Sequence, residues 1–257
     1  MIIPELFKYE SPVLPDDAIF RISPSQIGKF FEYPKVWYLE NIKGDTPVFK
    51  GSTATITGTI CHYIYECLTK KIDVDRESIN STLDEYKKTC DIQDVNWNQI
   101  KADYPLVAGS VVNEYLLTAN NKGCLIESEK QIASKVMDGI YVAGTIDRIE
   151  GDVVVDFKTV STKPNESSIP FHYKIQLLSY AYALRKKGYE INRIRIVYGI
   201  KPTKTLPARC VVVTENIDYV SEQLMNNTLK LIAESVLKVR ENPELTYLIF
   251  KSYDLKE

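Results

Sequence analysis

The chain has 257 residues, 44% hydrophobic and 26% charged, with a formal net charge of −2, so its composition excludes a charged disordered chain and gives no global sign of a polyanionic partner. No apolar run reaches the roughly 18 residues of a membrane-spanning helix, and the first residues lack a signal-peptide pattern, so we expect a cytoplasmic protein with no membrane partner. The five cysteines are odd in number and form no Cys-x-x-Cys pair, which favours reduced thiols over disulfides or a thiolate zinc site.

The first 120 residues are predicted to be mostly helical. Ser23-Pro24-Ser25 is typical of a helix start, because serine caps a helix and proline suits its first turn. Residues 46–57 have a loop-like composition. A helix is expected from about Gly58 to Lys71, where apolar residues recur at helical spacing, and further helices are expected near 76–90 and 98–120.

From residue 124 the pattern changes to alternating and β-branched residues, which are typical of strands. The predicted order is strands near 124–136, 140–149 and 153–159, a helix at 171–187, strands near 192–200 and 208–214, and a helix at 217–240. We therefore expect one α/β domain over 1–257, with a helical N-terminal part (1–120) and an α/β core (121–257).

A two-residue hairpin loop is predicted at Gly151-Asp152, between two alternating runs. In that register Asp147 lies opposite Asp156, and Lys158 points to the same side as Asp156. Two facing carboxylates repel, and a divalent cation held between them would offset the repulsion. The alternative is a solvated hairpin with surface charges, which fits poorly with the apolar residues around Asp156.

His62 is a further candidate ligand on the predicted helix that begins near Gly58. Imidazole suits manganese better than magnesium, although a helical histidine is more often structural than a ligand. Glu66 follows one turn later and would orient His62 or form a structural pair. Glu127 and Glu129 are expected on one strand face, where either could reach a metal or both could be solvated.

Gln176 and Tyr180 lie four residues apart on a predicted helix, and both can donate and accept hydrogen bonds. The alternative is an ordinary polar stripe on an amphipathic helix. Around them, residues 161–210 hold ten Lys or Arg against two Glu, which leaves the rest of the chain acidic. Such asymmetry can mark a nucleic-acid face, and it can also be a solvated helix face.

Taken in chain order, these motifs resemble the RecB-type branch of the PD-(D/E)xK nuclease superfamily. The N-terminal Ser23–Ile27 segment, Tyr33-Pro34 and Trp37-Tyr38 are also similar to that branch, so the resemblance spans residues 23–180. The motifs are Gly58-x-x-x-His62-x-x-x-Glu66, Glu129, Gly144-Thr145-Ile146-Asp147-Arg148, Asp156-Phe157-Lys158-Thr159 and Gln176-x-x-x-Tyr180.

The resemblance implies a restriction-endonuclease-like core, a mixed central sheet flanked by helices, and a metal-dependent DNA exonuclease of recombination, repair or phage and mobile-element DNA processing. A recombination or helicase partner is expected. An endonuclease with the same site, a catalytically inactive nucleic-acid-binding module and a nuclease acting on RNA remain alternatives.

The resemblance also implies roles for single residues. Lys158 would position the attacking water or stabilise charge on the phosphate, and Glu66 and Glu129 would support the site. The implied Mg²⁺ or Mn²⁺ ligands are His62, Asp147, Asp156 and the backbone carbonyl of Phe157, and the implied DNA contacts are Gln176, Tyr180, Lys174 and Thr159.

One position departs from many relatives. They carry a cysteine before the proline, where this chain has Tyr33, and pair it with three more cysteines near the C-terminus to hold an iron–sulfur cluster. Here the last cysteine is Cys210, so such a set cannot be completed. We predict no iron–sulfur cluster, which moves the interpretation toward cluster-free exonucleases.

Overall fold

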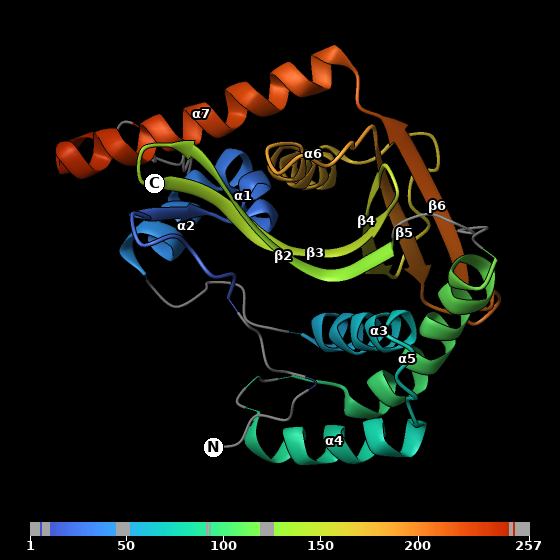
Figure 1. Ribbon diagram of the computed structural model, residues 1–257. Helices are drawn as coiled ribbons and strands as arrows, with labels where there is room; N and C mark the ends of the chain where they lie inside the picture. Colours follow the sequence, from blue (N-terminus) through green and yellow to red (C-terminus); the bar gives the residue numbers. More distant parts are fainter. Residues whose placement is uncertain are drawn as a thin grey trace.

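A computed structural model describes residues 6, 11–44, 52–90, 92, 94–118, 126–246 and 249. Within these residues the centre of the molecule is a six-stranded sheet with helices on both faces (Figure 1). This arrangement confirms the predicted α/β class, a mixed sheet flanked by helices. The strands are β1 (Phe20–Ile22), β2 (Ile126–Met137), β3 (Ile140–Glu150), β4 (Val153–Val160), β5 (Arg193–Ile200) and β6 (Arg209–Asn216).

The sheet forks at β3. The strand order is β1-β3-β4-β5-β6, and β2 pairs with β3 along most of its length. β1 runs parallel to the start of β3, β4 runs antiparallel to its end, and β4 and β5 are parallel. Sequence patterns predicted every strand except β1, because three residues are too few to show a period. As a result, the end of β3 lies between β2 and β4.

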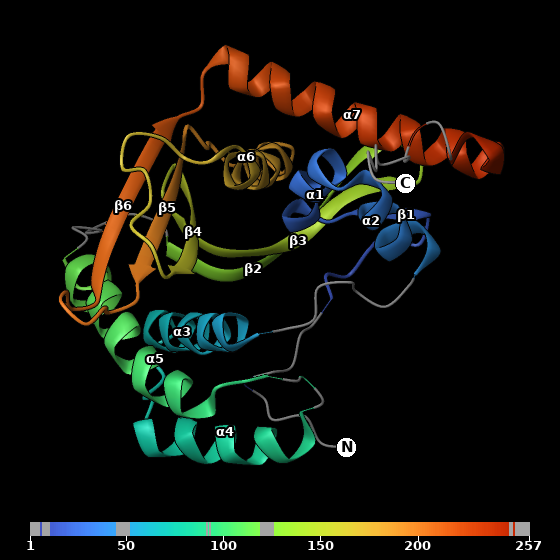
Figure 2. The same ribbon diagram turned by 180° about the vertical axis from the view of Figure 1, so that it is seen from behind.

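Helices cover the two faces of the sheet (Figures 1 and 2). We call them the α6 face and the α3 face. In β4, Val154 packs in the core of the α6 face, whereas Val153 and Val155 pack in the core of the α3 face. The α6 face carries α1 (Ile27–Glu32), α2 (Pro34–Tyr38), α6 (Phe171–Arg185) and α7 (Tyr219–Glu241), and the α3 face carries α3 (Thr53–Thr69), α4 (Arg76–Thr89) and α5 (Trp97–Val111).

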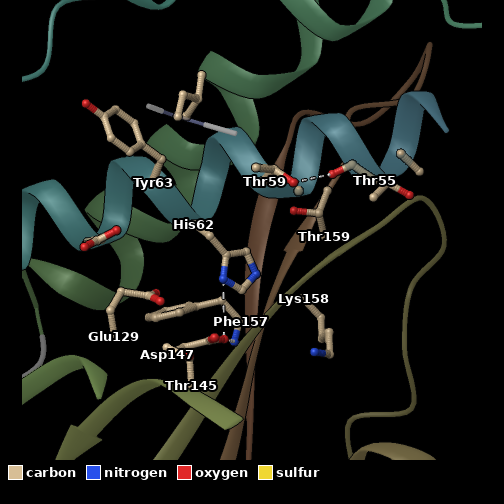
Figure 3. A pocket seen from close by; sticks show the side chains of 14 residues that line it. Thr55, Thr59, His62, Tyr63, Glu129, Thr145, Asp147, Phe157, Lys158 and Thr159 are labelled. Carbon is tan, nitrogen blue, oxygen red and sulfur yellow. Dashed lines mark hydrogen bonds and ion pairs between the residues drawn. The ribbon is translucent and has the colours of Figure 1, made fainter. Parts of the chain in front are cut away.

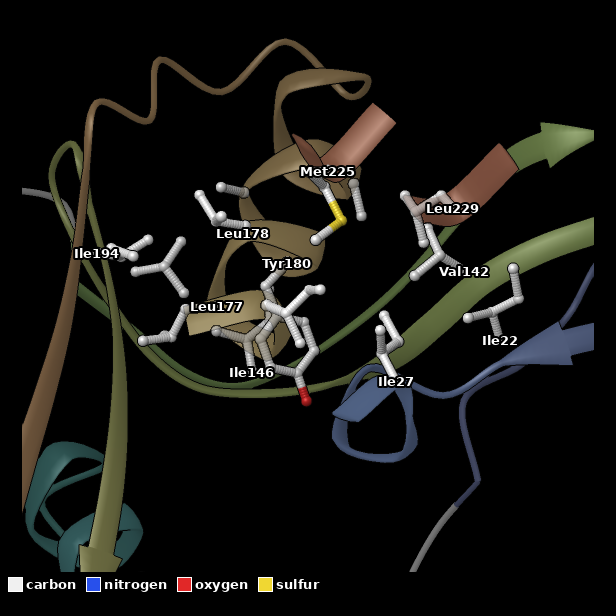
Figure 4. Close-up of a cluster of buried hydrophobic side chains, with 14 of the residues drawn as sticks. Ile22, Ile27, Val142, Ile146, Leu177, Leu178, Tyr180, Ile194, Met225 and Leu229 are labelled. Carbon is white, nitrogen blue, oxygen red and sulfur yellow. The ribbon is translucent and has the colours of Figure 1, made fainter. Parts of the chain in front are cut away.

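Figure 4 shows the core of the α6 face. Leu177 and Leu178 of α6 meet Ile146 of β3 and Met225 of α7, and each of these side chains is at most 2% exposed. At roughly 1.5–3 kcal/mol for each large apolar side chain, this burial holds α6 and α7 on the sheet. The second turn of α6 lies against β4, where Gln176 contacts Asp156.

The start of α3 corrects the prediction of a loop over residues 46–57. The helix begins at Thr53, where the side chain of Ser52 caps it by accepting from the Thr55 amide at 3.3 Å. The run from Thr53 to Thr57 is rich in β-branched residues, which lower helix propensity and hide the helix from a sequence pattern. Residues 46–51, like the predicted strand start at 124–125 and helix end at 119–120, lie outside the described residues.

The predicted helix over 98–120 is α5 followed by one π-helical turn at Val112–Leu116. None of the described helices combines the length and apolar content that crossing a bilayer requires. Four of the cysteines (61, 67, 90 and 210) are free thiols, and Cys124 lies outside the described residues.

The turn end of the β3–β4 hairpin, which we call the closed end, holds a buried network of charges. Glu150 accepts hydrogen bonds from Arg148 Nε at 2.6 Å, Arg195 Nη1 at 2.8 Å and Tyr115 Oη at 2.7 Å. Arg148 also donates from Nη1 to Thr69 Oγ1 at 2.7 Å, which ties the network to α3. Both carboxylate oxygens of Glu150 are therefore satisfied by protein groups.

Candidate active site

The β3–β4 hairpin opens immediately beyond its third pair of residues. The Gly151-Asp152 loop has the predicted register, with Gly151 at a left-handed φ of 58°. Pairing stops at Arg148↔Val155, and the described ladder does not include the predicted Asp147–Asp156 pair. Instead, Asp147 Oδ2 accepts the backbone N–H of Phe157 at 2.8 Å. The Asp147 side chain thus accepts the Phe157 amide, which in a continuous ladder would donate to the backbone of β3. We call this region, where the two strands separate, the open end.

The two aspartates at the open end have different partners. Asp147 contacts His62 of α3, whereas Asp156 contacts Gln176 of α6. The directly opposed pair that the hairpin register predicted is absent from the described ladder, because β3 leaves its regular pairing with β4 before Asp147. The two groups still interact electrostatically, since burial raises the pKa of Asp156 and the negative charge of Asp147 raises it further.

His62 and Asp147 lie together at the open end (Figure 3). His62 Nδ1 lies 3.5 Å from Asp147 Oδ2. Burial lowers the pKa of His62, but the adjacent Asp147 carboxylate outweighs this effect and holds the pKa at about 9. Conversely, burial raises the pKa of Asp147, while His62 and Lys158 outweigh burial and lower it. Without a metal the pair therefore favours an imidazolium beside a carboxylate.

Glu129 joins this pair through an irregular point in β2. Its φ of 50° is left-handed, a conformation that costs a non-glycine residue roughly 1–2 kcal/mol. The β2–β3 ladder skips it, between Ser128↔Arg148 and Lys130↔Ile146. Burial raises the pKa of Glu129 to about 7, and the negative charge of Asp147 adds to the effect. A strained, electrostatically unfavourable carboxylate points to a functional site.

The same irregularity separates Glu129 from Glu127, and it corrects the expectation that the two share a face. Glu127 accepts from Lys130 at 2.6 Å and from Tyr189 Oη at 2.9 Å. It is thus part of a structural cluster. Only Glu129 of the two is directed at His62 and Asp147.

Asp156 and Lys158 form a second ion pair at the open end. The Lys158 ammonium lies 2.9 Å from Asp156 Oδ1 and 2.7 Å from Oδ2, and Gln176 Nε2 donates to Oδ1 at 3.0 Å. Burial lowers the pKa of Lys158, but the charges of Asp156 and Asp147 outweigh burial and raise it. Despite the nearby ammonium, Asp156 Oδ2 has no hydrogen bond of good geometry within the described residues.

The donor set fits a divalent cation. Ligand atoms of His62, Glu129 and Asp147 all lie within 4.8 Å of one another. Carboxylate oxygens suit magnesium and manganese, and an imidazole favours manganese. The Asp156 side chain is only 4% exposed, and its Oδ2 has the Lys158 ammonium at 2.7 Å but no hydrogen bond of good geometry among the described residues, so it is an additional acceptor. Three carboxylates around one lysine and one histidine leave negative charge that a cation can balance.

A cavity of about 600 Å³ opens onto this donor set between α3 and the sheet. Thr159 lines it, as do Phe157 and Lys158. Glu66 also lines it, but its carboxylate pairs with Lys70 rather than His62. On the α3 side the wall contains Gly58, whose absent side chain leaves open space. The cavity thus has room for a substrate directly beside the donor atoms.

The remaining predicted contacts lie on α6. Gln176 is 8% exposed and holds Asp156, as described above. Tyr180 is 6% exposed and packs in the core of the α6 face (Figure 4). Its ring also lies close to Gly144. Lys174 Nζ contacts Glu215 Oε2 at 2.7 Å. A direct contact of each with DNA stays a prediction.

The basic segment 161–210 is less basic in space than in sequence. Among the described residues, six of its ten cations pair with carboxylates, three of them at the ends of the sheet: Arg193 with Asp152, Arg195 with Glu150, and Lys174 with Glu215. The other three pairs are Lys163–Glu166, Arg185–Glu222 and Lys201–Asp103. The segment therefore does not form an uninterrupted positive track.

Comparison with known proteins agrees with this geometry. The family model of the PD-(D/E)XK nuclease superfamily matches residues 21–244, which is most of the chain. No curated protein sequence is significantly similar.

Two solved structures are similar to this chain, and the first of them superposes well enough to support the fold. A putative exonuclease from Eubacterium rectale superposes with a TM-score of 0.56 at 14% identity, covering 86% of this chain and 81% of its own. An alkaline exonuclease from Laribacter hongkongensis gives a TM-score of 0.40 at 11% identity, covering 92% and 95%.

Proposed function

The chain belongs to the PD-(D/E)XK nuclease superfamily, and from that premise we propose that it is a metal-dependent deoxyribonuclease that digests DNA from its ends. One observation carries the proposal: three donor side chains, His62, Glu129 and Asp147, converge within 4.8 Å at the open end, beside Lys158. A site of this composition is typical of metal-assisted phosphodiester hydrolysis. In this proposal residues 1–257 act as one nuclease domain.

The ligands of the cation are assigned from contacts and from the family resemblance. His62, Asp147 and Asp156 hold it together with the backbone carbonyl of Phe157, and Glu129 supports them. When bound, a divalent cation supplies charge neutralisation on the phosphate and activation of the attacking water. Mn²⁺ is expected to support higher activity than Mg²⁺, because His62 contributes an imidazole.

The other residues bind and orient the substrate. Lys158 provides a fixed positive charge beside the scissile phosphate, in a partly buried place where electrostatic stabilisation is strong. Gln176 fixes the Asp156 carboxylate through its side-chain amide. Thr159 and Lys174 contact the DNA backbone, and Tyr180 holds the position of α6 against β3.

Digestion of end-labelled linear and covalently closed circular DNA tests the proposal. The purified protein is incubated with Mg²⁺, Mn²⁺ or a chelator. We expect linear DNA to be shortened from its ends only with a divalent cation, and circular DNA to stay intact. Opening of the circle would assign an endonuclease. Linear DNA that stays undigested with both Mg²⁺ and Mn²⁺ would overturn the proposed function. A role in recombination, repair or phage DNA processing would then have no basis.

Lys158→Ala and a matched lysine variant extend the test. Lys158→Ala removes the charge near the scissile phosphate, so we expect cutting to be lost while DNA binding is nearly unchanged. Lys101→Ala is the control, because Lys101 pairs with Asp84 on the surface of α5 and α4, away from the donor set. Normal cutting by Lys158→Ala would refute the role of Lys158.

A further inference from the structure

The Lys158 ammonium has two neighbours of different kinds. One is the Asp156 carboxylate, whose oxygens lie 2.9 and 2.7 Å from Nζ. The other is the ring of Tyr173, whose centroid lies 5.2 Å from Nζ. This separation is within the ~6 Å over which an aromatic face attracts an ammonium. The Lys158 side chain is 23% exposed, so solvent screens the contact only in part.

Tyr173 is held in place by its surroundings. It lies in the first turn of α6, where its backbone N–H donates to Pro170 at 3.0 Å. Its ring contacts His172 with a centroid separation of 3.9 Å, and Tyr198 at 6.4 Å. Tyr198 is 1% exposed and is the β5 partner of Lys158 in the sheet. The ring is thus supported by the same strand that lies beside the lysine.

A divalent cation affects the two neighbours differently. A cation bound by Asp156 would engage the carboxylate that Lys158 contacts, and its positive charge would repel the ammonium. The Tyr173 ring is neutral and does not compete for a hard cation, which prefers oxygen ligands such as carboxylates. The attraction between ring and ammonium therefore persists when the carboxylate is engaged.

We propose that Tyr173 is a positioning residue, which keeps the Lys158 ammonium in place beside the substrate phosphate while a metal ion occupies Asp156. The inference rests on the proposed function, because it assigns Lys158 to the reacting phosphate. It identifies the face of the ring, and not the hydroxyl, as the active feature. Tyr173 acts through Lys158 and has no contact of its own with the reacting atoms.

Kinetics of ring variants test the assignment. Tyr173→Leu removes the aromatic face, so we expect kcat to fall roughly 3- to 30-fold while KM for DNA is unchanged. Tyr173→Phe retains the face and keeps kcat close to that of the parent protein. Phenylalanines with increasing fluorination at position 173 keep the shape but weaken the negative face, so kcat should fall step by step.

Tyr182→Leu is the matched control. Tyr182 lies on the same helix, and its ring contacts the Lys186 ammonium at 5.6 Å, away from Lys158. Its loss removes a contact of the same kind and should leave kcat unchanged. Equal losses of kcat in Tyr173→Phe and Tyr173→Leu, or no loss in either, would overturn the positioning role.

A readout without cutting separates this inference from the proposed function. In protein labelled with ¹³C-lysine, the Tyr173 ring current shifts the Lys158 Hε signals upfield. We expect the shift to persist on addition of Mg²⁺, to remain in Tyr173→Phe and to vanish in Tyr173→Leu. Loss of the shift when Mg²⁺ binds overturns the inference even if DNA is cut. A persistent shift in a protein that cuts no DNA overturns the proposed function instead.

Discussion

The two ends of the β3–β4 hairpin both contain buried charges, and they neutralise them differently. At the closed end, Glu150 lies between Arg148 and Arg195, and both of its oxygens accept hydrogen bonds. At the open end, three carboxylates surround Lys158 and His62, and Asp156 Oδ2 has no hydrogen bond among the described residues. Protein groups complete the first set of charges and leave the second incomplete.

We infer from this difference that the closed end is a structural cluster and the open end is a binding site. A buried charge with all its partners stabilises a single arrangement of the fold, and removing one partner is costly. A group of carboxylates in excess over cations costs stability until a ligand balances it. Substitutions at the closed end should therefore change stability, and substitutions at the open end should change activity.

Asp147→Asn gives the largest effect on activity. Loss of this ligand should reduce the rate of DNA cutting on the order of 10³-fold, the scale of losing one electrostatic contact to the reacting groups. The fold should be retained, because the asparagine side chain keeps an oxygen that can accept the Phe157 amide, although the ion pair with His62 is lost. Initial rates on end-labelled DNA and thermal unfolding without metal measure the two effects. A rate near that of the parent protein would contradict the assigned role.

Glu150→Gln gives the opposite result at the closed end. The two arginines lose their common carboxylate in a buried place, so the free energy of unfolding should fall by about 3 kcal/mol. Folded protein should keep a kcat similar to that of the parent. Urea denaturation followed by circular dichroism measures the change. The comparison breaks down if cutting is lost while stability is unchanged.

Metal binding should stabilise the protein through the open end only. A cation whose free concentration is 100 times its Kd stabilises the native state by about 2.7 kcal/mol, because it binds the folded protein and not the unfolded chain. The melting temperature should rise with Mn²⁺ and return on chelation. Asp147→Asn should lose this response and Glu150→Gln should keep it. An equal response in both variants would place the cation elsewhere.

Glu129→Gly tests the strained residue. Glycine adopts the φ of 50° freely, so the free energy of unfolding of the metal-free protein should rise by about 1 kcal/mol. This value is smaller than the full cost of the strain, because glycine also makes the unfolded chain more flexible. Affinity for Mn²⁺ should decrease, because one donor is removed. Unfolding without metal and calorimetric titration measure the two changes. Lower stability together with unchanged metal affinity would assign Glu129 a purely structural role.

The pH dependence of stability tests the two raised pKa values at the open end. The pKa of Glu129 is raised to about 7, so its contribution is present below the ordinary value near 4.5 and is lost as pH rises to 7. The pKa of His62 is raised to about 9, so its contribution is present below 6.5 and is lost as pH rises through 9. The melting temperature without metal should therefore fall gradually between pH 5 and 9. A flat profile in the parent protein would contradict both shifts.

Sequence patterns predicted the hairpin loop and most of the elements, because alternation and the Gly151-Asp152 turn are local signals. They did not predict how the strands separate after Arg148↔Val155, since a side chain there replaces a backbone acceptor. The left-handed Glu129 was also missed, because no glycine or asparagine marks that position. Pattern alone therefore located the charged residues and placed Lys158 beside Asp156, but it did not give the separation of the strands at Asp147.

The position of His62 beside Asp147 depended on long-range packing. The helical period placed His62 on α3 but could not say which face of the sheet α3 would cover. The family resemblance supplied that connection. The pairing of the basic segment 161–210 with distant carboxylates was equally invisible, because Glu150 and Glu215 lie outside the segment. Local patterns thus defined the elements, and tertiary contacts determined which charges remain available.

The parallel pairing of β1 with β3 has a consequence for synthesis on the ribosome. Phe20 lies beside Ile140, so the first strand meets its partner only after 120 more residues have been made. At about 5–20 residues per second, this takes roughly 6 to 24 seconds. During that interval the aromatic N-terminal segment, with Phe30 and Trp37, has no sheet to cover. A nascent chain halted before residue 140 would therefore expose a surface that chaperones recognise.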